Sequence, residues 1–191
     1  MGFNISEKYT GIKSLFTFSA FCDKLTFPQR VKMILFSLIL NKFMMYRSPY
    51  MINQEQLIKK AFEAQKFSYA PYSQFNVGAA LLCADGTIYT GCNIENAAFS
   101  PTNCAERTAF FKAISEGKKD FVAIAIVGNK SNVEKGQGDY CAPCAVCRQV
   151  MAEFRDLEKF QVIMAKDDND YIENTLGELI PLAFTGKDLN S

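Results

Sequence analysis

The feature that most constrains the fold is an unbroken apolar run, Phe121–Val127, in which β-branched residues are the most frequent. Such a run is typical of a strand buried on both faces, because a strand with one exposed face alternates apolar and polar residues. The segments around it alternate between helical and strand-like patterns. We therefore expect an α/β fold in which helices cover both faces of a sheet.

The expected elements follow one another from residue 51 onward. Helices are predicted at about 52–67, 104–115 and 144–154, with a last helical turn or two at 175–180. Strands are predicted at 75–83, 87–93, 121–127 and 161–165, with a short fifth strand at 171–174. Ala84-Asp85-Gly86 has the composition of a hairpin turn.

Composition excludes several classes of function. The 191 residues are 49% hydrophobic with a net charge of +1, which allows a packed core and argues against a protein that coats nucleic acid. Histidine is absent, so Ser-His-Asp systems and histidine zinc motifs are excluded and any metal must bind thiolates or carboxylates. The odd count of seven cysteines, three of them spaced by three, favours a metal site in a reducing compartment over disulfides.

Residues 1–50 and 51–191 differ in how their apolar residues are spaced. The first part lacks a clean helical or strand period, and its most apolar stretch, Met33–Leu40, is far shorter than the roughly 20 residues of a spanning helix. A helical face begins after Met51. We interpret 51–191 as the functional domain and 1–50 as an N-terminal extension that is disordered or precedes the native start. On this hypothesis Met51 is the functional initiator.

Two short segments place cysteines at predicted helix starts, Cys104-Ala105-Glu106 and Pro143-Cys144-Ala145-Val146-Cys147. A helix N-terminus favours thiolates, and Cys144 and Cys147 share a helical face. Together with Cys104 they would hold Zn²⁺ and leave the fourth tetrahedral position open, as in catalytic zinc sites. Glu106 could then reach the metal-bound water as the proton carrier, which is the pattern of zinc deaminases in its three-cysteine form.

Two other interpretations of these cysteines are weighed. Cys141 lies three residues before Cys144, so a closed, structural four-thiolate zinc site is one alternative, and it would leave Glu106 without a role. A redox pair of Cys144 and Cys147 is another. For Cys22, Cys83 and Cys92, the prediction is ordinary buried thiols.

Three thiolates overcompensate the charge of a divalent zinc ion, which blunts the acidity of its bound water. A cationic side chain is therefore expected near the sulfurs. Arg107, directly after Glu106, and Arg148, directly after Cys147, are the candidates. We favour Arg107 as the residue that contacts the ligand sulfurs without binding the metal itself.

Four segments together closely resemble the small, homotetrameric zinc-dependent cytidine deaminases. They are Phe75–Ala80 (FNVGAA), Gly91–Asn96 (GCNIEN), Asn103–Ala109 (NCAERTA) and Pro143–Gln149 (PCAVCRQ). The resemblance covers 51–191 and none of 1–50. It implies a three-layer αβα fold around a mixed five-stranded sheet, with active sites built at the subunit contacts of a homotetramer. Many members of this family carry glycine at the position of Ala145. The methyl group of alanine is easily accommodated in a helix turn.

The resemblance also implies the reaction: hydrolytic deamination of cytidine and deoxycytidine to uridine and deoxyuridine, with release of ammonia, as part of cytoplasmic pyrimidine salvage. A zinc-activated water attacks C4 of the pyrimidine, and Glu106 moves protons to N3 and the leaving amine. Asn93 and Glu95 would bind the ribose hydroxyl. Phe75 and, from a neighbouring subunit, Phe184 would pack around the ligand. The expected partners are a small-molecule nucleoside and further copies of the chain, without nucleic acid or membrane.

Other substrates and a non-enzymatic role remain as alternatives. Blasticidin-type deaminases share the zinc motif, and Asn93 and Glu95 favour a nucleoside instead. The carboxylate of Glu95 disfavours a nucleotide phosphate, and the near-neutral charge disfavours editing of polynucleotides. A zinc-stabilised binding module would follow from the closed four-thiolate site.

Overall fold

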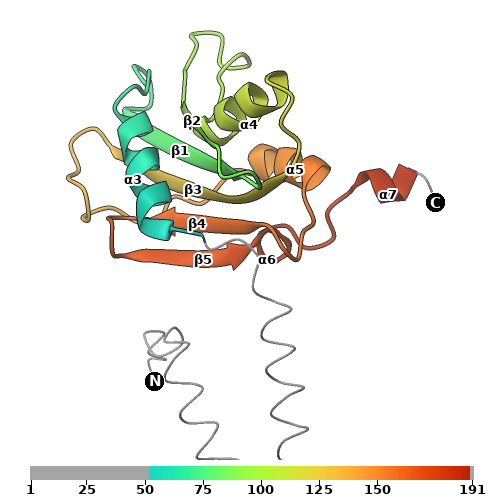
Figure 1. Ribbon diagram of the computed structural model, residues 1–191. Coiled ribbons are helices and arrows are strands. Elements are labelled where there is room, and N and C mark those ends of the chain that lie inside the picture. The colour runs from blue at the N-terminus through green and yellow to red at the C-terminus, as the bar shows by residue number, and fades with distance from the viewer. Residues whose placement is uncertain (1–51, 190–191) are drawn as a thin grey trace, which may run out of the picture. The chain divides into compact units, whose positions relative to one another are not determined.

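The computed structural model describes residues 52–189, so the predicted extension (residues 1–50) and Met51 lie outside the described part of the chain. Within it, five strands form one mixed sheet in the order β2-β1-β3-β4-β5 (Figure 1). The strands are β1 (Phe75–Cys83), β2 (Ile88–Cys92), β3 (Phe121–Lys130), β4 (Gln161–Ala165) and β5 (Tyr171–Thr175). β3 and β4 run parallel, and the other neighbouring pairs are antiparallel.

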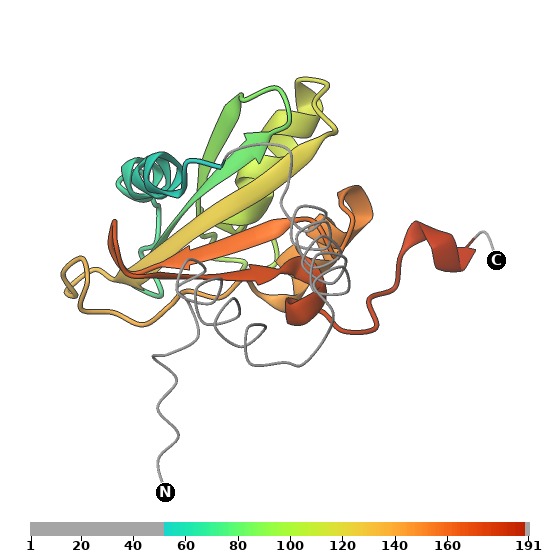
Figure 2. The ribbon, with the colours of Figure 1, turned by 60° about the horizontal axis from the view of Figure 1, so that its bottom comes forward.

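Helices cover both faces of this sheet, as Figure 2 shows. One face carries α3 (Gln54–Gln65), and the other carries α4 (Ala105–Ser115), α5 (Ala145–Phe154) and the short α6 (Leu176–Leu179). A further short helix, α7 (Gly186–Leu189), follows α6 and projects away from the sheet (Figure 1). The predicted α/β fold with a mixed five-stranded sheet between helical layers is confirmed.

The apolar run that predicted this arrangement lies in the central strand β3. Successive side chains of a strand point to opposite faces, and those of β3 do so into two separate cores. Ile124 and Ile126 pack with α4 and α5, whereas Ala123, Ala125 and Val127 pack with α3. Phe121 joins the first of these cores out of alternation, where the pairing of β3 with β1 shifts register beside Cys83. Both faces of β3 are therefore buried, which is the reason for its unbroken apolar sequence.

Most predicted elements match the observed ones within a few residues. β3 is the main exception, because it continues past Val127 to Lys130. The polar end of the strand stays extended because it pairs with the start of β1, where Phe75 lies opposite Lys130. α7 was not expected from the sequence pattern. No helix within residues 52–189 is long and apolar enough to cross a membrane.

Candidate metal and active site

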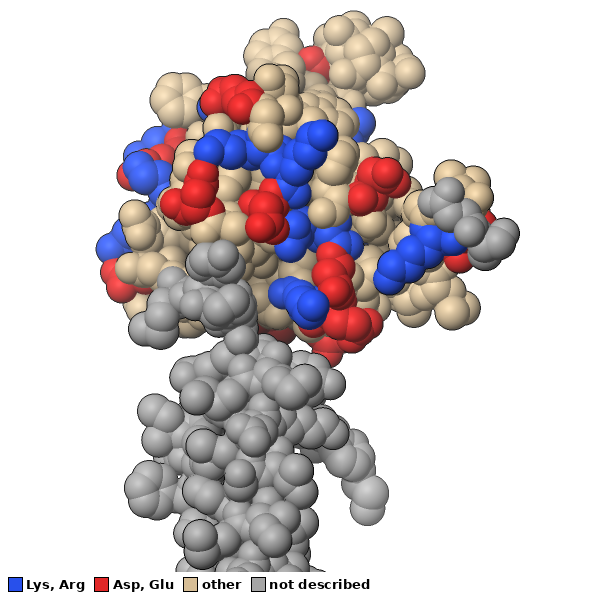
Figure 3. Space-filling model, turned by 45° about the vertical axis from the view of Figure 1, so that its right-hand side comes forward, with Lys and Arg blue, Asp and Glu red and all other residues tan. Residues whose placement is uncertain are grey.

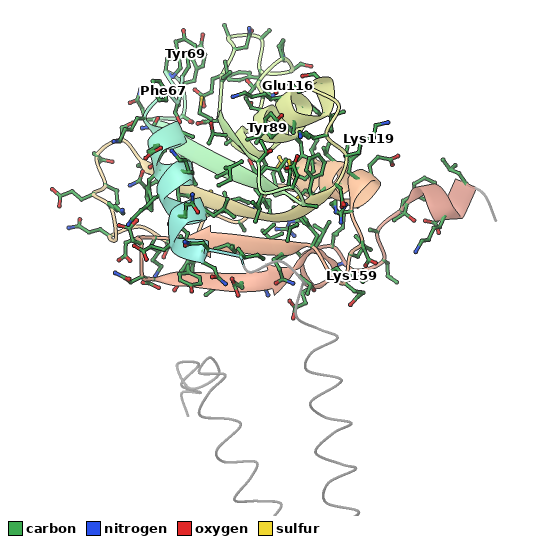
Figure 4. All side chains as sticks on the ribbon, in the orientation of Figure 1. Phe67, Tyr69, Tyr89, Glu116, Lys119 and Lys159 are labelled. Atoms are coloured by element: carbon green, nitrogen blue, oxygen red, sulfur yellow. The ribbon has the colours of Figure 1, made fainter. Side chains whose placement is uncertain are left out.

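Two helix N-termini supply the predicted metal ligands. Cys104 is the N-cap of α4 and Cys144 is the N-cap of α5, both with extended backbone and without a capping hydrogen bond from the side chain. Cys147 follows in the first turn of α5 and is buried. Each sulfur thus lies where free backbone amides and the helix dipole favour negative charge. The sulfur atoms gather between α4 and α5 (Figure 4).

The spacing of the three sulfurs fits a zinc ion. The Sγ of Cys104 lies 3.8 Å from that of Cys144, which lies 3.5 Å from that of Cys147. All three atoms are within 4.8 Å of one another. Tetrahedral zinc with Zn–S bonds of about 2.3 Å requires sulfurs about 3.8 Å apart. Three soft thiolate donors select zinc over hard cations, and they occupy three of four tetrahedral positions.

Cys141 is not part of this cluster. Among residues 52–189, the group with metal-binding spacing consists of Cys104, Cys144 and Cys147 alone. The Cys141 side chain packs instead against Gly128, where an added Cβ would lie 2.6 Å from its sulfur. Burial raises the pKa of Cys141 to about 12, which keeps the thiol neutral. The closed four-thiolate alternative is therefore not formed.

The pKa shifts of Cys104 and Cys147 also favour a bound cation. The pKa of Cys104 is lowered to about 5, first because the Cys147 thiol donates to its sulfur and also because Arg107 does. The pKa of Cys147 is raised, because its proton is held by Cys104 and because it is buried. Cys104 and Cys147 thus share one proton, and a positive charge between their sulfurs, such as that of a bound zinc ion, would allow both to ionise.

Glu106 is the buried charged residue beside the sulfurs. It occupies the second position of α4 and is only 4% exposed. Burial raises its pKa to about 7, and the nearby Cys104 raises it further. A carboxyl group whose pKa is close to the working pH can both accept and return a proton. This arrangement suits a proton carrier next to an open metal position.

The two candidate arginines have different surroundings. Nη2 of Arg107 donates to the carbonyl oxygen of Thr102, at 3.1 Å, and to the Sγ of Cys104, at 3.6 Å. Arg148 instead donates to the carbonyl oxygens of Pro143 and Leu179, both at 2.7 Å. Arg107 thus contacts a metal-ligand sulfur, whereas Arg148 joins the start of α5 to the end of α6.

Three of the predicted nucleoside-binding residues lie at the ends of β1 and β2: Phe75 is the first residue of β1, and Asn93 and Glu95 follow the end of β2. The side-chain amide of Asn93 spans the start of β1: its Oδ1 accepts from the backbone amide of Val77, and its Nδ2 donates to the carbonyl oxygen of Phe75, both at 2.8 Å. This pair of bonds holds Phe75 and Asn93 together. The ring of Phe75 and the sulfur of Cys141 both lie beside Gly128. These two side chains are therefore neighbours.

Glu95 is held by the turn that follows α3, a contact that was not predicted from the sequence. Its Oε2 accepts from the backbone amides of Tyr72, at 2.9 Å, and Ser73, at 3.2 Å. The pKa of Glu95 is lowered by a hydrogen bond from the Ser73 side chain and by these two amides. Glu95 therefore stays ionised and ready to accept a hydrogen bond. The turn-forming Tyr69–Ser73 segment was the only signal in the sequence.

Phe184, the last of the predicted site residues, lies near the C-terminal end of the described residues. It is on the segment between α6 and α7, and its side chain is 59% exposed. Its carbonyl oxygen accepts from Nε2 of Gln149, at 2.7 Å, which ties the segment to α5. Neighbouring Leu182 is fully exposed and Leu189 largely so. The C-terminal segment thus presents apolar side chains away from its own domain.

Comparison with known proteins places this arrangement in a family. The family model described as "Cytidine and deoxycytidylate deaminase zinc-binding region" matches residues 51–164. A cytidine deaminase from Halalkalibacterium halodurans is 47% identical over 139 residues, which are 73% of this chain and 99% of that protein. One from Sporosarcina psychrophila is 48% identical over 136 residues, 71% of this chain and 94% of that protein.

Solved structures agree with the sequence comparison. The crystal structure of a cytidine deaminase from Burkholderia pseudomallei is 41% identical and has a TM-score of 0.62, covering 70% of this chain and 100% of that one. The fold, the open three-thiolate cluster and these similarities have one explanation. The chain belongs to the cytidine deaminase family of zinc-dependent hydrolytic deaminases.

Proposed function

We propose that the chain hydrolyses cytidine and deoxycytidine to uridine and deoxyuridine, with release of ammonia. The observation that carries this proposal is the set of Cys104, Cys144 and Cys147 around an open tetrahedral position, with the buried carboxyl group of Glu106 beside it. The relatives at 47% and 48% identity are named cytidine deaminases, which supports the choice of substrate.

Glu106 carries the protons of the reaction in this proposal. Bound zinc supplies a Lewis acid that makes a water molecule nucleophilic at neutral pH. Glu106 takes a proton from that water and gives it to N3 of the pyrimidine, so that C4 becomes susceptible to attack. Once the water oxygen has bonded to C4, Glu106 takes the second proton of that water from the new hydroxyl group on C4 and gives it to the amino group. The C4–N bond then breaks, ammonia leaves, and C4 becomes a carbonyl carbon. The burial of Glu106 and its pKa of about 7 suit both transfers.

Arg107 adjusts the charge of the ligand set. Its guanidinium group donates to the Cys104 sulfur at 3.6 Å and is anchored by the Thr102 carbonyl oxygen. The positive charge offsets part of the excess negative charge of three thiolates. The zinc site thereby keeps the Lewis acidity that a purely thiolate site would lose.

The sugar is bound by Asn93 and Glu95 in this proposal, and the base packs on Phe75. Both backbone amides that hold Glu95 bind its Oε2, and a carboxylate has about four lone-pair sites, so Glu95 can accept a further hydrogen bond from a sugar hydroxyl. An ionised carboxylate at this point also repels a phosphate group, which favours nucleosides over nucleotides. The aromatic ring of Phe75 suits the neutral pyrimidine.

The functional unit that we propose is a homotetramer in which Phe184 completes the site of a neighbouring subunit. The exposed side chains of Leu182, Phe184 and Leu189 support this, because they give the C-terminal segment an apolar surface without cover from its own domain. Measurement of the molar mass in solution by light scattering tests it, and a monomeric active enzyme would contradict it.

Several further assignments belong to the same proposal. The deaminase domain is residues 51–191, residues 1–50 are an extension to it, and the enzyme works in cytoplasmic pyrimidine salvage. The expected partner is a nucleoside and not nucleic acid. In support, basic and acidic side chains are interspersed on the face shown in Figure 3 instead of forming a basic groove.

An ammonia-release assay with cytidine, deoxycytidine, deoxycytidine monophosphate and blasticidin S tests the activity, with the zinc content measured on the same sample. We expect about one zinc ion per chain and turnover of the two nucleosides. Turnover of blasticidin S alone would indicate the related antibiotic deaminases. Zinc without any turnover would indicate a structural zinc module and overturn the proposal.

A further inference from the structure

The hydroxyl group of Thr108 joins three backbone segments at one point in α4. The single proton of its Oγ1 is shared between the carbonyl oxygens of Cys92 and Cys104, each at 3.1 Å. The same oxygen accepts from the side-chain Nδ2 of Asn103, also at 3.1 Å. One hydroxyl group thus connects the end of β2, the end of the following loop and a metal ligand.

β2 and the start of α4 pack closely against each other at this junction. An added Cβ at Gly91 would lie 2.4 Å from the carbonyl oxygen of Ala105 and 2.9 Å from the Cβ of Thr108, so β2 and the first turns of α4 are in direct contact. The backbone of Asn103 pairs with Ile94 in both directions, at 2.9 Å. The loop between them is therefore closed at its base, next to Thr108.

The two sides of this junction have different functions under the proposed activity. Cys104 is a metal ligand and lies beside Glu106. Cys92 directly precedes Asn93, and Ile94 directly precedes Glu95, and these are the residues proposed to bind the sugar. Thr108 is thus the point where the sugar-binding segment is attached to the helix that carries the reacting groups.

We propose that Thr108 is a positioning residue that sets the distance between the sugar-binding segment and the metal site. A nucleoside carries its reacting C4 at one end and its sugar hydroxyls at the other, joined by a short rigid framework. Binding of the sugar assists reaction at C4 only if the protein holds the two contact points at a fixed separation. The inference rests on the proposed function, because it takes Asn93 and Glu95 as the sugar contacts.

The test compares cytidine with 2′,3′-dideoxycytidine, which lacks the hydroxyl groups on the sugar ring. Thr108→Val removes the hydroxyl group at nearly constant volume, and Thr108→Ser keeps it. Thr90→Val is the matched control, because strand alternation places Thr90 on the opposite face of β2 from Tyr89, which packs with the α4 core. Thr108→Ala is a second variant that cannot introduce a steric clash.

For Thr108→Val we expect the kcat/KM for cytidine to fall about tenfold, mainly through KM, as expected when contacts remote from the reacting atoms are misplaced. The kcat/KM for dideoxycytidine should change little, so the preference for cytidine shrinks. The zinc content should be unchanged, Thr108→Ser should restore the preference, and Thr90→Val should match the unmodified protein. Calorimetric binding of uridine and 2′,3′-dideoxyuridine should show the same loss of discrimination without turnover.

Several outcomes would overturn the inference and can be told apart from failure of the proposed function. If Thr108→Val or Thr108→Ala folds, retains zinc and keeps the full preference for the ribose, Thr108 does not position the sugar segment. If both variants lose activity on the two substrates equally, Thr108 only supports the metal helix. If the unmodified protein neither turns over cytidine nor prefers uridine to dideoxyuridine in binding, the proposed function itself fails.

Discussion

Nη2 of Arg107 lies 3.6 Å from the Sγ of Cys104 and is anchored on the other side by the carbonyl oxygen of Thr102. The contact is local, because Arg107 is one helical turn beyond Cys104 at the start of α4. It places a permanent positive charge beside a ligand set that is otherwise rich in negative charge. On our proposal, the charge of the zinc site is therefore adjusted from within the helix that supplies the first ligand.

Replacing Arg107 should weaken the chemistry without removing the metal. We expect Arg107→Ala to lower kcat about tenfold, because the more negative ligand set makes the zinc a weaker Lewis acid. Arg107→Lys should be intermediate, since lysine keeps the charge but lacks the guanidinium group whose Nη2 contacts both Thr102 and Cys104. Ammonia release per bound zinc measures the effect.

Arg155→Ala is the control for this experiment, because Arg155 pairs with the exposed Asp120 on the surface. It should retain the activity of the unmodified protein. Equal activity of Arg107→Ala and Arg155→Ala would show that Arg107 has no influence on the zinc ligands.

Glu106→Gln should separate metal binding from proton transfer. The amide has nearly the shape of the carboxyl group but cannot accept and return a proton, so kcat should fall by about a hundredfold to ten-thousandfold. The zinc content, measured by mass spectrometry, should not change. Glu116→Gln, at the other end of α4, should remain active because Glu116 contacts Tyr89 and not the sulfurs (Figure 4). Retained turnover in Glu106→Gln would rule out the assigned proton carrier.

Cys141→Ala tests whether the metal site is open. The protein should still bind about one zinc ion per chain, because Cys141 packs on Gly128 outside the cluster. Its stability should fall by about 1 kcal/mol, measured by urea unfolding, because the lost sulfur leaves a small cavity. Cys144→Ser should instead lose most of its zinc. Loss of zinc in Cys141→Ala would mean that the fourth thiol is a ligand after all.

Co-expression of two damaged chains tests the proposed exchange of Phe184 between subunits. Phe184→Ala should raise KM about tenfold, given the roughly 1.5–3 kcal/mol that burial of a phenylalanine contributes. In mixed assemblies, some sites combine the Glu106 of one chain with the Phe184 of the other and are complete. At low substrate concentration, the mixture with Glu106→Gln should exceed the summed activities of the separate variants. Simple addition of activities would place Phe184 in its own subunit's site or outside the site altogether.

Much of the fold is predictable because it rests on local periodicity. The spacing of apolar residues predicts that β3 is buried on both faces and that α3 packs through one apolar face. The three cysteines at helix starts, with Glu106 near the first of them, are equally local. Spacing alone could not separate Arg107 from Arg148, since each follows a functional residue on a helix. It also could not place Cys141, whose surroundings come from Gly128 on another strand.

The sequence by itself determined most of the helices and strands and the two short cysteine segments that supply donors for zinc, because each depends on residues only a few positions apart. The tertiary structure alone decided which groups meet across longer separations. It brings Cys104 within 3.8 Å of Cys144, keeps Cys141 out of the cluster and links Thr108 to Cys92. These distances follow from how α4 and α5 pack on the sheet, and packing depends on the shape of all the contacting side chains and not on any one motif.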